Sequence, residues 1–478
     1  MLPDGDACYR ALRTHDTRFD GRFFVAVTST RIYCRPICTA KPVKRENCRF
    51  YATAAEAEAA RYRPCLRCRP ELAPGNASVD ASARLAHAAA IAIENDTYGD
   101  GGFGEIARRL GVTDRHLRRV FGAEFGVSPV AFAQTQRLLL AKRLLTDTTM
   151  SVTDVAFASG FSSLRRFNAL FVERYRLRPF ELRKRREVEP RGDADAIELN
   201  IAVRPPYSWE TLAAFLASRT IDGVEEIDGH SYRRTVRIVR GEKTHEGWIE
   251  IAPVKNRHAL RLRISGSLTG VLPAVLGKAK YLTDASADPI AIATALGKLA
   301  KNEPGLRVPG AFDGFEVAVR AVLGQQITVK AARTLAARFA AAFGAPIETP
   351  FAGLRLLFPS GTEIAGKTVD EIARLGIIAS RTRTIIALAA AIADGALLLQ
   401  PGADVEATLD ALRALPGIGE WTAQYIAMRA LAWPDAFPHT DLGVMKALGE
   451  KNSKRVLEAG EAWRPWRAYA VMHLWRSL

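Results

Sequence analysis

Apolar residues recur along the chain with two different spacings, and the spacing changes where the type of element changes. From residue 79 to about residue 178 the spacing is helical, with interruptions at 99–104 and at short turns that contain glycine. Across roughly 196–300, apolar residues alternate with polar ones or form β-branched runs, which predicts a small antiparallel sheet with strands at Ser231–Arg240, 247–251 and 260–264. From Phe312 onward an Ala- and Leu-rich helical pattern returns, broken at Pro416-Gly417 and at Pro434.

Two short segments of turn-forming or charged residues separate these patterns. Residues 71–75 read Glu-Leu-Ala-Pro-Gly and follow a segment rich in cysteine and arginine, so we expect a linker there. Residues 183–195 begin with a basic run and continue with acidic residues, Pro190 and Gly192, which predicts a second, charged linker. The chain is thereby divided into a short N-terminal part, a helical part and a longer C-terminal part.

The composition indicates several folded domains and a polyanionic partner. The 478 residues correspond to about three domains of roughly 150 residues, and 48% of them are hydrophobic, which excludes a disordered or fibrous chain. Lys and Arg number 67 against 51 Asp and Glu, a net charge of +16 that favours nucleic acid or an anionic membrane as partner. The excess is uneven, since residues 1–190 hold 32 basic and 21 acidic side chains and residues 191–478 hold 35 and 30. Neither a long uncharged apolar run nor a signal-peptide pattern is present, so we expect a cytoplasmic protein that does not bind membranes.

All six cysteines lie within the first 68 residues, and four of them have the spacing of metal ligands. Cys34 and Cys38 form a C-x3-C pair, and Cys65 and Cys68 form a C-x2-C pair. In a reducing compartment such clustering favours a tetrahedral zinc site over disulfides. On spacing alone the site is interpreted as a structural zinc site that allows the segment to fold, with a chance grouping as the alternative.

The residues around these cysteines make the interpretation more specific. Residues 4–72 resemble the methyl-acceptor domain of the adaptive-response protein Ada in the motifs FFVAV at 23–27, IYCRPIC at 32–38, REN at 45–47, FY at 50–51 and RPCLRC at 63–68. The resemblance implies that Cys34, Cys38, Cys65 and Cys68 bind Zn²⁺ and that Cys34 takes a methyl group from a methylphosphotriester in DNA. Zinc keeps thiolates deprotonated at neutral pH, and methylating one sulfur removes negative charge, so we expect methylation to strengthen DNA binding in a salt-dependent way. Cys8 and Cys48 lie outside the motif and are expected to be ordinary cysteines.

Two helix-turn-helix units follow. Residues 103–121 contain a helix, a turn at Gly111 and a second helix capped by Thr113, and residues 152–167 repeat this plan with the turn at Gly160. With an intervening helix near 130–145, the pair resembles the AraC-type DNA-binding domain over residues 79–182. Residues on the second helix of each unit, its N-terminal ones above all, are candidates for contacting DNA bases, with a solvated helix face as the alternative for any single one. These candidates are Arg115, His116, Arg118 and Arg119 in the first unit and Ser162, Ser163, Arg165 and Arg166 in the second.

The C-terminal part carries a hairpin motif with two glycines. Residues 415–419 read Leu-Pro-Gly-Ile-Gly, a helix-hairpin-helix pattern in which Gly417 and Gly419 let backbone N–H groups approach a phosphate. A tight turn between two helices is the alternative for this motif alone. Together with Phe-Pro-His-Thr-Asp at 437–441 and motifs at 199–209, 313–326 and 463–475, it resembles the helix-hairpin-helix glycosylases over residues 196–478, most closely the 3-methyladenine DNA glycosylase II or AlkA type.

This resemblance implies roles for single residues. Asp441 matches the catalytic aspartate of that family. Cleaving the glycosidic bond to an already cationic base needs a flipped base and one carboxylate beside an oxocarbenium-like sugar. An N-cap for a helix at Leu442–Leu448 is the structural alternative. Trp421 stands where lyase relatives carry a Schiff-base lysine, which predicts a monofunctional glycosylase. The expected DNA contacts include Gln325 and Gln326, and Gln326 stands where relatives insert a leucine wedge into the duplex. The expected base pocket consists of Trp421, Tyr425 and Trp475. Packing in the hydrophobic core is the alternative for each of these three aromatic residues.

The absence of cysteine after Cys68 excludes two related activities. A second acceptor thiol for O6-methylguanine and a four-cysteine iron–sulfur cluster both need thiols that residues 69–478 do not contain. The chain therefore departs from the Ada pattern that includes Pro-Cys-His-Arg, and from the cluster-bearing branch of the glycosylases.

The predicted architecture is a multidomain α+β protein that repairs alkylated DNA and regulates transcription. Two alternatives stay open, a repair glycosylase whose N-terminal domains only bring it to DNA and a transcription factor whose C-terminal domain binds damage without cleaving. The implied partners are alkylated and promoter double-stranded DNA and RNA polymerase, and the implied cofactor is Zn²⁺. The predicted parts are a small zinc-binding α/β domain at 1–75, an all-α AraC-type double helix-turn-helix domain at 79–182, a linker at 183–195, a small antiparallel-sheet α+β domain at 196–305 and an all-α helix-hairpin-helix glycosylase domain at 306–478.

Overall fold

The chain forms two compact units. One unit is drawn from Met1–His87 and Arg115–Val127, and the other from Ala88–Asp114 and Ser128–Leu478. The computed structural model describes residues 4–15, 23–40, 43–51, 57, 60–65, 67–68, 78–94, 102–184 and 196–478. The predicted linkers at 71–75 and, except for its first two residues, at 183–195 lie outside the described residues. Within the described part of the chain, every helix is too short or too polar to cross a membrane.

The N-terminal segment combines a four-stranded sheet with a helix. The strands lie in the order β3-β1-β2-β4, with β1 antiparallel to β2 and β3, and with β2 parallel to β4. Alternate residues of β1 face opposite sides, so Val25 packs with Cys8 and Cys48 while Phe24 packs with Tyr33. Cys8 and Cys48, which the sequence left open as buried or surface cysteines, are buried in this core. The elements are α1 (Gly5–Arg13), β1 (Phe24–Val27), β2 (Ile32–Cys34), a 3₁₀ turn (Arg45–Asn47), β3 (Cys48–Tyr51) and β4 (Arg63–Pro64).

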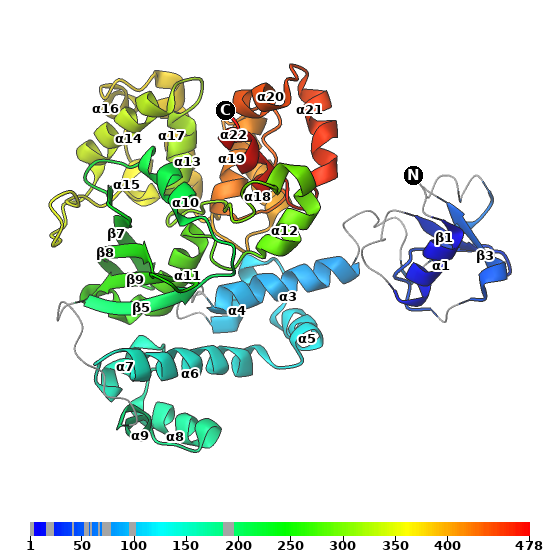
Figure 1. The fold of residues 1–478 in the computed structure, drawn as a ribbon, viewed down its shortest axis with the longest axis horizontal. Coiled ribbons are helices and arrows are strands. Elements are labelled where there is room, and N and C mark those ends of the chain that lie inside the picture. Colours follow the sequence, from blue (N-terminus) through cyan, green and yellow to red (C-terminus); the bar gives the residue numbers. More distant parts are fainter. Residues whose placement is uncertain are drawn as a thin grey trace. The chain divides into compact units, whose positions relative to one another are not determined.

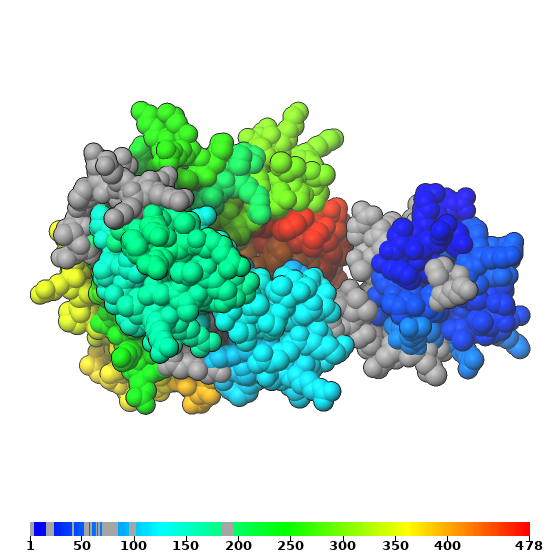
Figure 2. Space-filling view, turned by 90° about the horizontal axis from the view of Figure 1, so that it is seen from below, coloured from blue at the N-terminus to red at the C-terminus, as the bar shows by residue number. Residues whose placement is uncertain are grey.

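The described residues of the predicted helical part form helices joined by short turns. Gly111 and Gly160 have φ of 67° and 87°, the left-handed conformation that the two predicted turns require. Ser128, Ser151 and Ser163 cap the helices that follow them. Figure 2 shows residues 128–184, coloured teal, as a continuous block of surface. The helices are α3 (Ser78–Glu94), α4 (Gly102–Arg109), α5 (Asp114–Phe125), α6 (Pro129–Asp147), α7 (Val152–Ala158), α8 (Leu164–Tyr175) and α9 (Pro179–Lys184).

A five-stranded antiparallel sheet follows, as the alternating pattern predicts. The strand order is β5-β9-β8-β7-β6, and the sequence pattern located three of these strands and missed β5 and β6. Two helices share one hydrophobic cluster with the sheet, through Leu212 and Val275 against Ile249 and Leu262. The elements are β5 (Ala196–Ala202), α10 (Trp209–Ala217), β6 (Glu225–Asp228), β7 (Ser231–Arg240), β8 (Lys243–Pro253), β9 (Ala259–Ser265) and α11 (Leu272–Leu282).

The remaining residues form a helical layer, which Figure 1 shows above the sheet. Polar caps begin several of its helices: Asp313, Thr328, Asp404 and Asp441 each accept a hydrogen bond from a backbone N–H of the first turn. The fold class predicted from the sequence is thereby confirmed. The helices are α12 (Pro289–Leu296), α13 (Gly314–Leu323), α14 (Val329–Phe343), α15 (Gly361–Ala365), α16 (Val369–Ala373), α17 (Ala379–Ala393), α18 (Val405–Ala414), α19 (Glu420–Ala430), α20 (Leu442–Leu448), α21 (Ser453–Gly460) and α22 (Arg467–Arg476).

A buried ion cluster joins the sheet to this helical layer. Arg234 of β7 donates to Glu316 of α13 at 2.5 Å, and Arg320 of α13 donates to Glu316 at 2.7 Å and also to Glu225 of β6. Burial raises the pKa of Glu225, but the charges of Arg320 and Arg234 outweigh it and hold that pKa at about 2. Because each charge has at least one partner on another element, the cluster fixes the orientation of the sheet against α13.

Candidate functional sites

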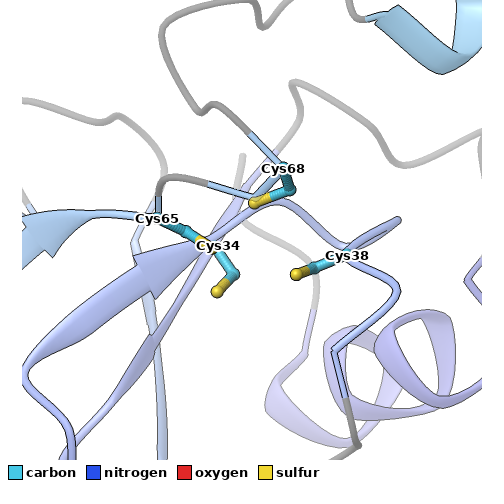
Figure 3. Close-up of side chains that lie close together, drawn as sticks. All are labelled: Cys34, Cys38, Cys65 and Cys68. Atoms are coloured by element: carbon cyan, nitrogen blue, oxygen red, sulfur yellow. The ribbon is translucent and has the colours of Figure 1, made fainter.

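Four cysteines come together at one end of the N-terminal sheet. Cys34 ends β2, Cys38 lies in the loop after it, and Cys65 and Cys68 follow β4. The parallel pairing of β2 with β4 brings the two pairs side by side, and Cys65 N–H donates to the Tyr33 carbonyl at 3.0 Å. All four Sγ atoms lie within 4.8 Å of one another, and Figure 3 shows them facing a common centre. Zn–S bonds of about 2.3 Å require sulfurs at such spacing, so the donor set fits a tetrahedral zinc ion.

The cysteine cluster is shielded from solvent and favours a bound cation. Cys34, Cys38 and Cys65 are buried and Cys68 is half-buried. Hydrogen bonds with Cys38 and Cys68, and then burial, raise the pKa of the Cys34 thiol, so a cation is needed to keep all four sulfurs deprotonated. Cys68 Sγ accepts a hydrogen bond from Arg35 N–H at 3.4 Å, and the Arg35 guanidinium donates to the Cys68 carbonyl at 3.1 Å. Arg35 therefore ties the second cysteine pair to the strand that carries the first.

The predicted DNA contacts of the two helix-turn-helix units lie mostly on exposed helix faces. Ser163 differs from the rest, because its Oγ accepts from Arg166 N–H at 3.4 Å and so caps α8. His116 is half-buried and its Nδ1 lies 3.2 Å from an Arg119 nitrogen. Their contact with DNA stays a prediction. The exposed members are Arg115, Arg118 and Arg119 on α5, Ser162 in the turn before α8, and Arg165 and Arg166 on α8.

A cleft of about 1230 Å³ opens in the C-terminal helical layer. The N-terminal ends of α14, α17, α19 and α20 reach it, through Val329, Ser380, Gly419 and Leu442. Helix N-termini carry partial positive charge and N–H groups without intrahelical partners. The rim of the cleft therefore favours negatively charged groups of a ligand.

Asp441 lies in this cleft with both carboxylate oxygens hydrogen-bonded. Oδ1 accepts from Val444 N–H at 2.9 Å and from Trp475 Nε1 at 2.8 Å, and Oδ2 accepts from Trp421 Nε1 at 2.7 Å. The bond to Val444 makes Asp441 the N-cap of α20, so the structural alternative from the sequence holds. It does not exclude a site role, because the same carboxylate is half-buried and lines the cleft.

Trp421, Tyr425 and Trp475 line the cleft together. The rings of Trp421 and Tyr425 stack with centroids 5.3 Å apart and an interplanar angle of 16°, and Tyr425 and Trp475 are tilted at 6.3 Å. The sequence predicted these three rings at one pocket. It missed the two indole N–H bonds to Asp441, because no local spacing relates residues of three different helices.

The cleft also holds arginines that sequence reasoning missed. Arg219, Arg320 and Arg429 line it beside Tyr425, whose hydroxyl accepts from Arg429 at 2.9 Å. Burial raises the pKa of Tyr425, but the charges of Arg429, Arg219 and Arg320 outweigh it and lower that pKa. This part of the cleft favours hydrogen-bond acceptors. Arg320 lies within the 313–326 motif, but the sequence pattern assigned none of the three arginines a role, since they come from three separated segments.

The glycine hairpin lies at the rim of the same cleft. Gly417 has φ of 81°, and a Cβ there would lie 2.2 Å from Thr384 Oγ1, so both conformation and space require glycine. Gly419 is the N-cap of α19, and as a glycine it has no side chain to accept a hydrogen bond from the first N–H groups of the helix. Both glycines are exposed, so backbone N–H groups at the start of α19 face solvent, as a phosphate site requires.

The loop between α13 and α14 faces the hairpin. The Gln325 side chain donates to the Gly417 carbonyl and to Thr422 Oγ1, each at 2.9 Å, so it joins the loop to the hairpin. Gln326 is exposed, lines the cleft and has φ of 55°, a left-handed conformation that is rare for a residue with a side chain. Its backbone therefore stores strain at the mouth of the cleft.

Family models match four successive parts of the chain. Residues 7–71 match the metal binding domain of Ada, and residues 106–185 match a helix-turn-helix domain. Residues 198–313 match the AlkA N-terminal domain, and residues 319–455 match the HhH-GPD superfamily base excision DNA repair protein. The zinc interpretation of the cysteine cluster is thereby confirmed.

One relative matches the whole chain, and others match parts of it. The chain is 39% identical over 491 residues to the probable bifunctional transcriptional activator/DNA repair enzyme AlkA of Mycobacterium tuberculosis, covering 100% of this chain and 97% of that protein. It is 34% identical over 272 residues to DNA-3-methyladenine glycosylase 2 of Escherichia coli, covering 57% of this chain and 94% of that protein. It is 34% identical over 164 residues to the bifunctional transcriptional activator/DNA repair enzyme Ada of Escherichia coli, covering 34% of this chain and 45% of that protein.

Proposed function

Since the chain belongs to the family of the probable bifunctional transcriptional activator/DNA repair enzyme AlkA, we propose that it joins two activities on alkylated DNA. The C-terminal half hydrolyses the N-glycosidic bond of alkylated bases such as 3-methyladenine, as a monofunctional glycosylase. The N-terminal half transfers a methyl group from DNA methylphosphotriesters to Cys34 irreversibly. The methylated protein then binds promoter DNA more tightly and activates transcription with RNA polymerase.

The glycosylase proposal rests on Asp441, a carboxylate that two indole N–H groups fix in a cleft large enough for a flipped nucleotide. In the reaction the C1′–N bond breaks, and its electron pair leaves with the alkylated base, which departs neutral. The negative charge of Asp441 stabilises the positive charge that develops on the sugar. Water then forms the C1′–O bond and releases a proton. Trp421 offers no amine for a Schiff base, in keeping with hydrolysis.

DNA is held and opened by the rim of the cleft. The N–H groups after Gly417 and Gly419 bind a backbone phosphate at the start of α19. Gln325 keeps the hairpin and the α13–α14 loop at a fixed separation through its two hydrogen bonds. Gln326, held in a left-handed conformation at the mouth, occupies the space that the flipped nucleotide leaves in the duplex.

Methyl transfer is a displacement at the methyl carbon of the phosphotriester. The Cys34 sulfur forms the S–C bond, the C–O bond breaks, and the electron pair stays on the phosphate oxygen, which restores the charge of the phosphodiester. Zinc, when bound by the four cysteines, keeps the sulfurs deprotonated at neutral pH. Cys68, the more exposed sulfur, is engaged by Arg35 N–H, which weakens it as a nucleophile. The product thioether is stable, so the transfer occurs once per protein.

One experiment tests both activities in the full chain. The protein is exposed to methylated duplex DNA, its intact mass is measured, and released bases are identified. We expect one methyl adduct on Cys34 together with free 3-methyladenine. D441N should release no base and keep the adduct, and C34S should show the reverse. Asn also caps helices well, so D441N preserves the start of α20, and C48S is a matched control outside the cluster.

The open alternatives give different results. Undiminished base release by D441N contradicts the enzyme assignment and favours a domain that only binds damage. Promoter affinity is measured by titration before and after exposure to methylphosphotriester DNA. An unchanged affinity contradicts the regulatory proposal and favours N-terminal domains that only target the glycosylase to DNA.

A further inference from the structure

We propose that Trp421 and Trp475 are positioning residues for Asp441, and that Gly443 is present because it lets the indole of Trp475 reach the carboxylate. The inference rests on the proposed glycosylase activity and assigns these tryptophans a role other than stacking on the base. It follows from the hydrogen bonds around Asp441 and from the space around Gly443.

The carboxylate of Asp441 has most of its acceptor sites filled. Two oxygens offer about four lone-pair sites, and Val444 N–H, Trp475 Nε1 and Trp421 Nε1 take three of them at 2.7–2.9 Å. Among contacts of the described residues, the remaining site is on Oδ2. The carboxylate therefore presents one defined oxygen to a ligand in the cleft.

The three donors come from separate parts of the helical layer. Trp421 lies in the first turn of α19, Val444 in the first turn of α20, and Trp475 near the end of α22. Rotation of the Asp441 side chain breaks bonds to more than one of these helices, and hydrogen bonds to an ionised acceptor are the strong kind. The plane of the carboxylate is therefore fixed before any substrate binds.

The ring faces are less available for stacking than the sequence suggested. One face of the Trp421 indole is covered by Tyr425, with the rings 16° from parallel. Both indoles also turn their N–H edges to Asp441, which fixes the direction of their rings. A role that depends on the N–H edge and a role that depends on the ring face make different predictions.

Gly443 provides the space that Trp475 needs. A Cβ at this position would lie 3.0 Å from Trp475 Cδ1, 3.3 Å from its Nε1 and 3.0 Å from Asp441 Oδ1. These distances are shorter than ordinary van der Waals contacts, so a methyl group would push the indole edge from the carboxylate. Gly443 is not among the glycines with positive φ, so its backbone conformation is open to alanine. The small size of the residue, rather than its flexibility, is what the site uses.

The test is single-turnover base release by the full chain, with enzyme in excess over a duplex that carries one N-methylated purine. Varying the enzyme concentration separates the maximal rate from the half-saturating concentration. In one variant a benzothiophene replaces the indole of Trp475, which keeps the ring face but has no N–H donor. The other is G443A, which keeps both tryptophans. Matched controls are W463F, a tryptophan outside the cleft, and G366A, where a Cβ meets no atom within 4 Å.

We expect both variants to lower the maximal rate by about 10- to 100-fold, the scale of a misplaced catalytic group, with an unchanged half-saturating concentration. Their effects should not add in the double variant, because both remove the same contact. A wild-type maximal rate in both variants overturns the proposal, and so does a change confined to the half-saturating concentration, since that is the signature of a stacking role.

A second measurement is independent of activity. The indole ¹H–¹⁵N resonances of Trp421 and Trp475 should shift in D441N, and that of Trp475 should shift in G443A while that of Trp463 stays in place. A wild-type protein that releases no base contradicts the proposed function. The indole resonances then still show whether Trp421 and Trp475 contact Asp441. Unshifted resonances in D441N overturn the positioning proposal even if the glycosylase is active.

Discussion

Replacing Asp284 by asparagine should remove a pH dependence from the stability of the C-terminal half. Asp284 follows α11, and its Oδ2 accepts hydrogen bonds from the Tyr469 hydroxyl of α22 at 2.9 Å and from Val308 N–H at 3.3 Å. Burial raises the pKa of this carboxyl from its ordinary 3.8 to about 7, and these hydrogen bonds with the charge of Arg307 offset it only in part. The folded protein therefore holds this proton more tightly than the unfolded chain.

The sign and size follow from linkage. The protonated carboxyl contributes stability that is fully present below pH 3.8 and is lost as the pH rises through about 7. One pKa unit corresponds to about 1.4 kcal/mol, so the total is about 4 kcal/mol of unfolding free energy. An amide keeps the acceptor for Tyr469 and does not titrate. The unfolding free energy of D284N minus that of wild type should therefore grow by about 2–3 kcal/mol between pH 5 and pH 8.

The assay is urea unfolding followed by tryptophan fluorescence at several pH values. All seven tryptophans lie at residue 209 or later, so the signal reports on the C-terminal half alone. Y469F is a control that should change the pH dependence of the unfolding free energy in the opposite direction. The Tyr469 hydroxyl lowers the pKa of Asp284, so its loss should make that pH dependence steeper. A difference between D284N and wild type that stays constant from pH 5 to pH 8 refutes the reasoning.

Three further predictions concern the other sites. G417A should lower the unfolding free energy of the C-terminal half by more than about 1 kcal/mol, because it forces a side chain into a left-handed conformation and against a neighbouring hydroxyl. G419A should cost little, and urea unfolding of both variants measures the difference. Equal losses contradict the role of the positive φ at Gly417. Removing zinc with a chelator should make the buried Cys8 and Cys48 react with a thiol reagent, while tryptophan fluorescence stays unchanged; protection of both thiols would mean that the N-terminal sheet folds without metal. Q326G should relieve the strained backbone and raise the unfolding free energy by about 1 kcal/mol. The same variant should slow base release from duplex DNA more than from single-stranded DNA. Equal slowing on both substrates contradicts a role of Gln326 in opening the duplex.

Local motifs carried most of the functional prediction. Each cysteine pair, each helix-turn-helix unit and the glycine hairpin is one continuous stretch of sequence, and each encodes a local geometry by itself. The four cysteines meet as predicted because β2 and β4 are short, parallel neighbours. The domain boundaries and the DNA contacts of Arg115 or Arg165 stay predictions.

The strand pattern shows the limit of periodicity. β7 was located residue for residue, since Ser231–Arg240 is a long β-branched run. β6 was missed because Glu225–Asp228 is short and acidic, and its buried Glu225 belongs to the ion cluster rather than to the apolar core. Its burial depends on Arg234 and Arg320, which lie outside the strand.

The sequence by itself determined which chemical groups the protein has: four thiols at metal spacing, a hairpin with glycines at 417 and 419, and one aspartate at the start of a helix. Those features depend on neighbours along the chain, where bond geometry limits the possible structures. Only the tertiary structure decided how the aspartate is used. The indole donors of Trp421 and Trp475 come from other helices, and packing of helices, rather than any local preference, brings them to within hydrogen-bond distance of the carboxylate. The same packing lines the cleft beside Tyr425 with Arg219 and Arg320.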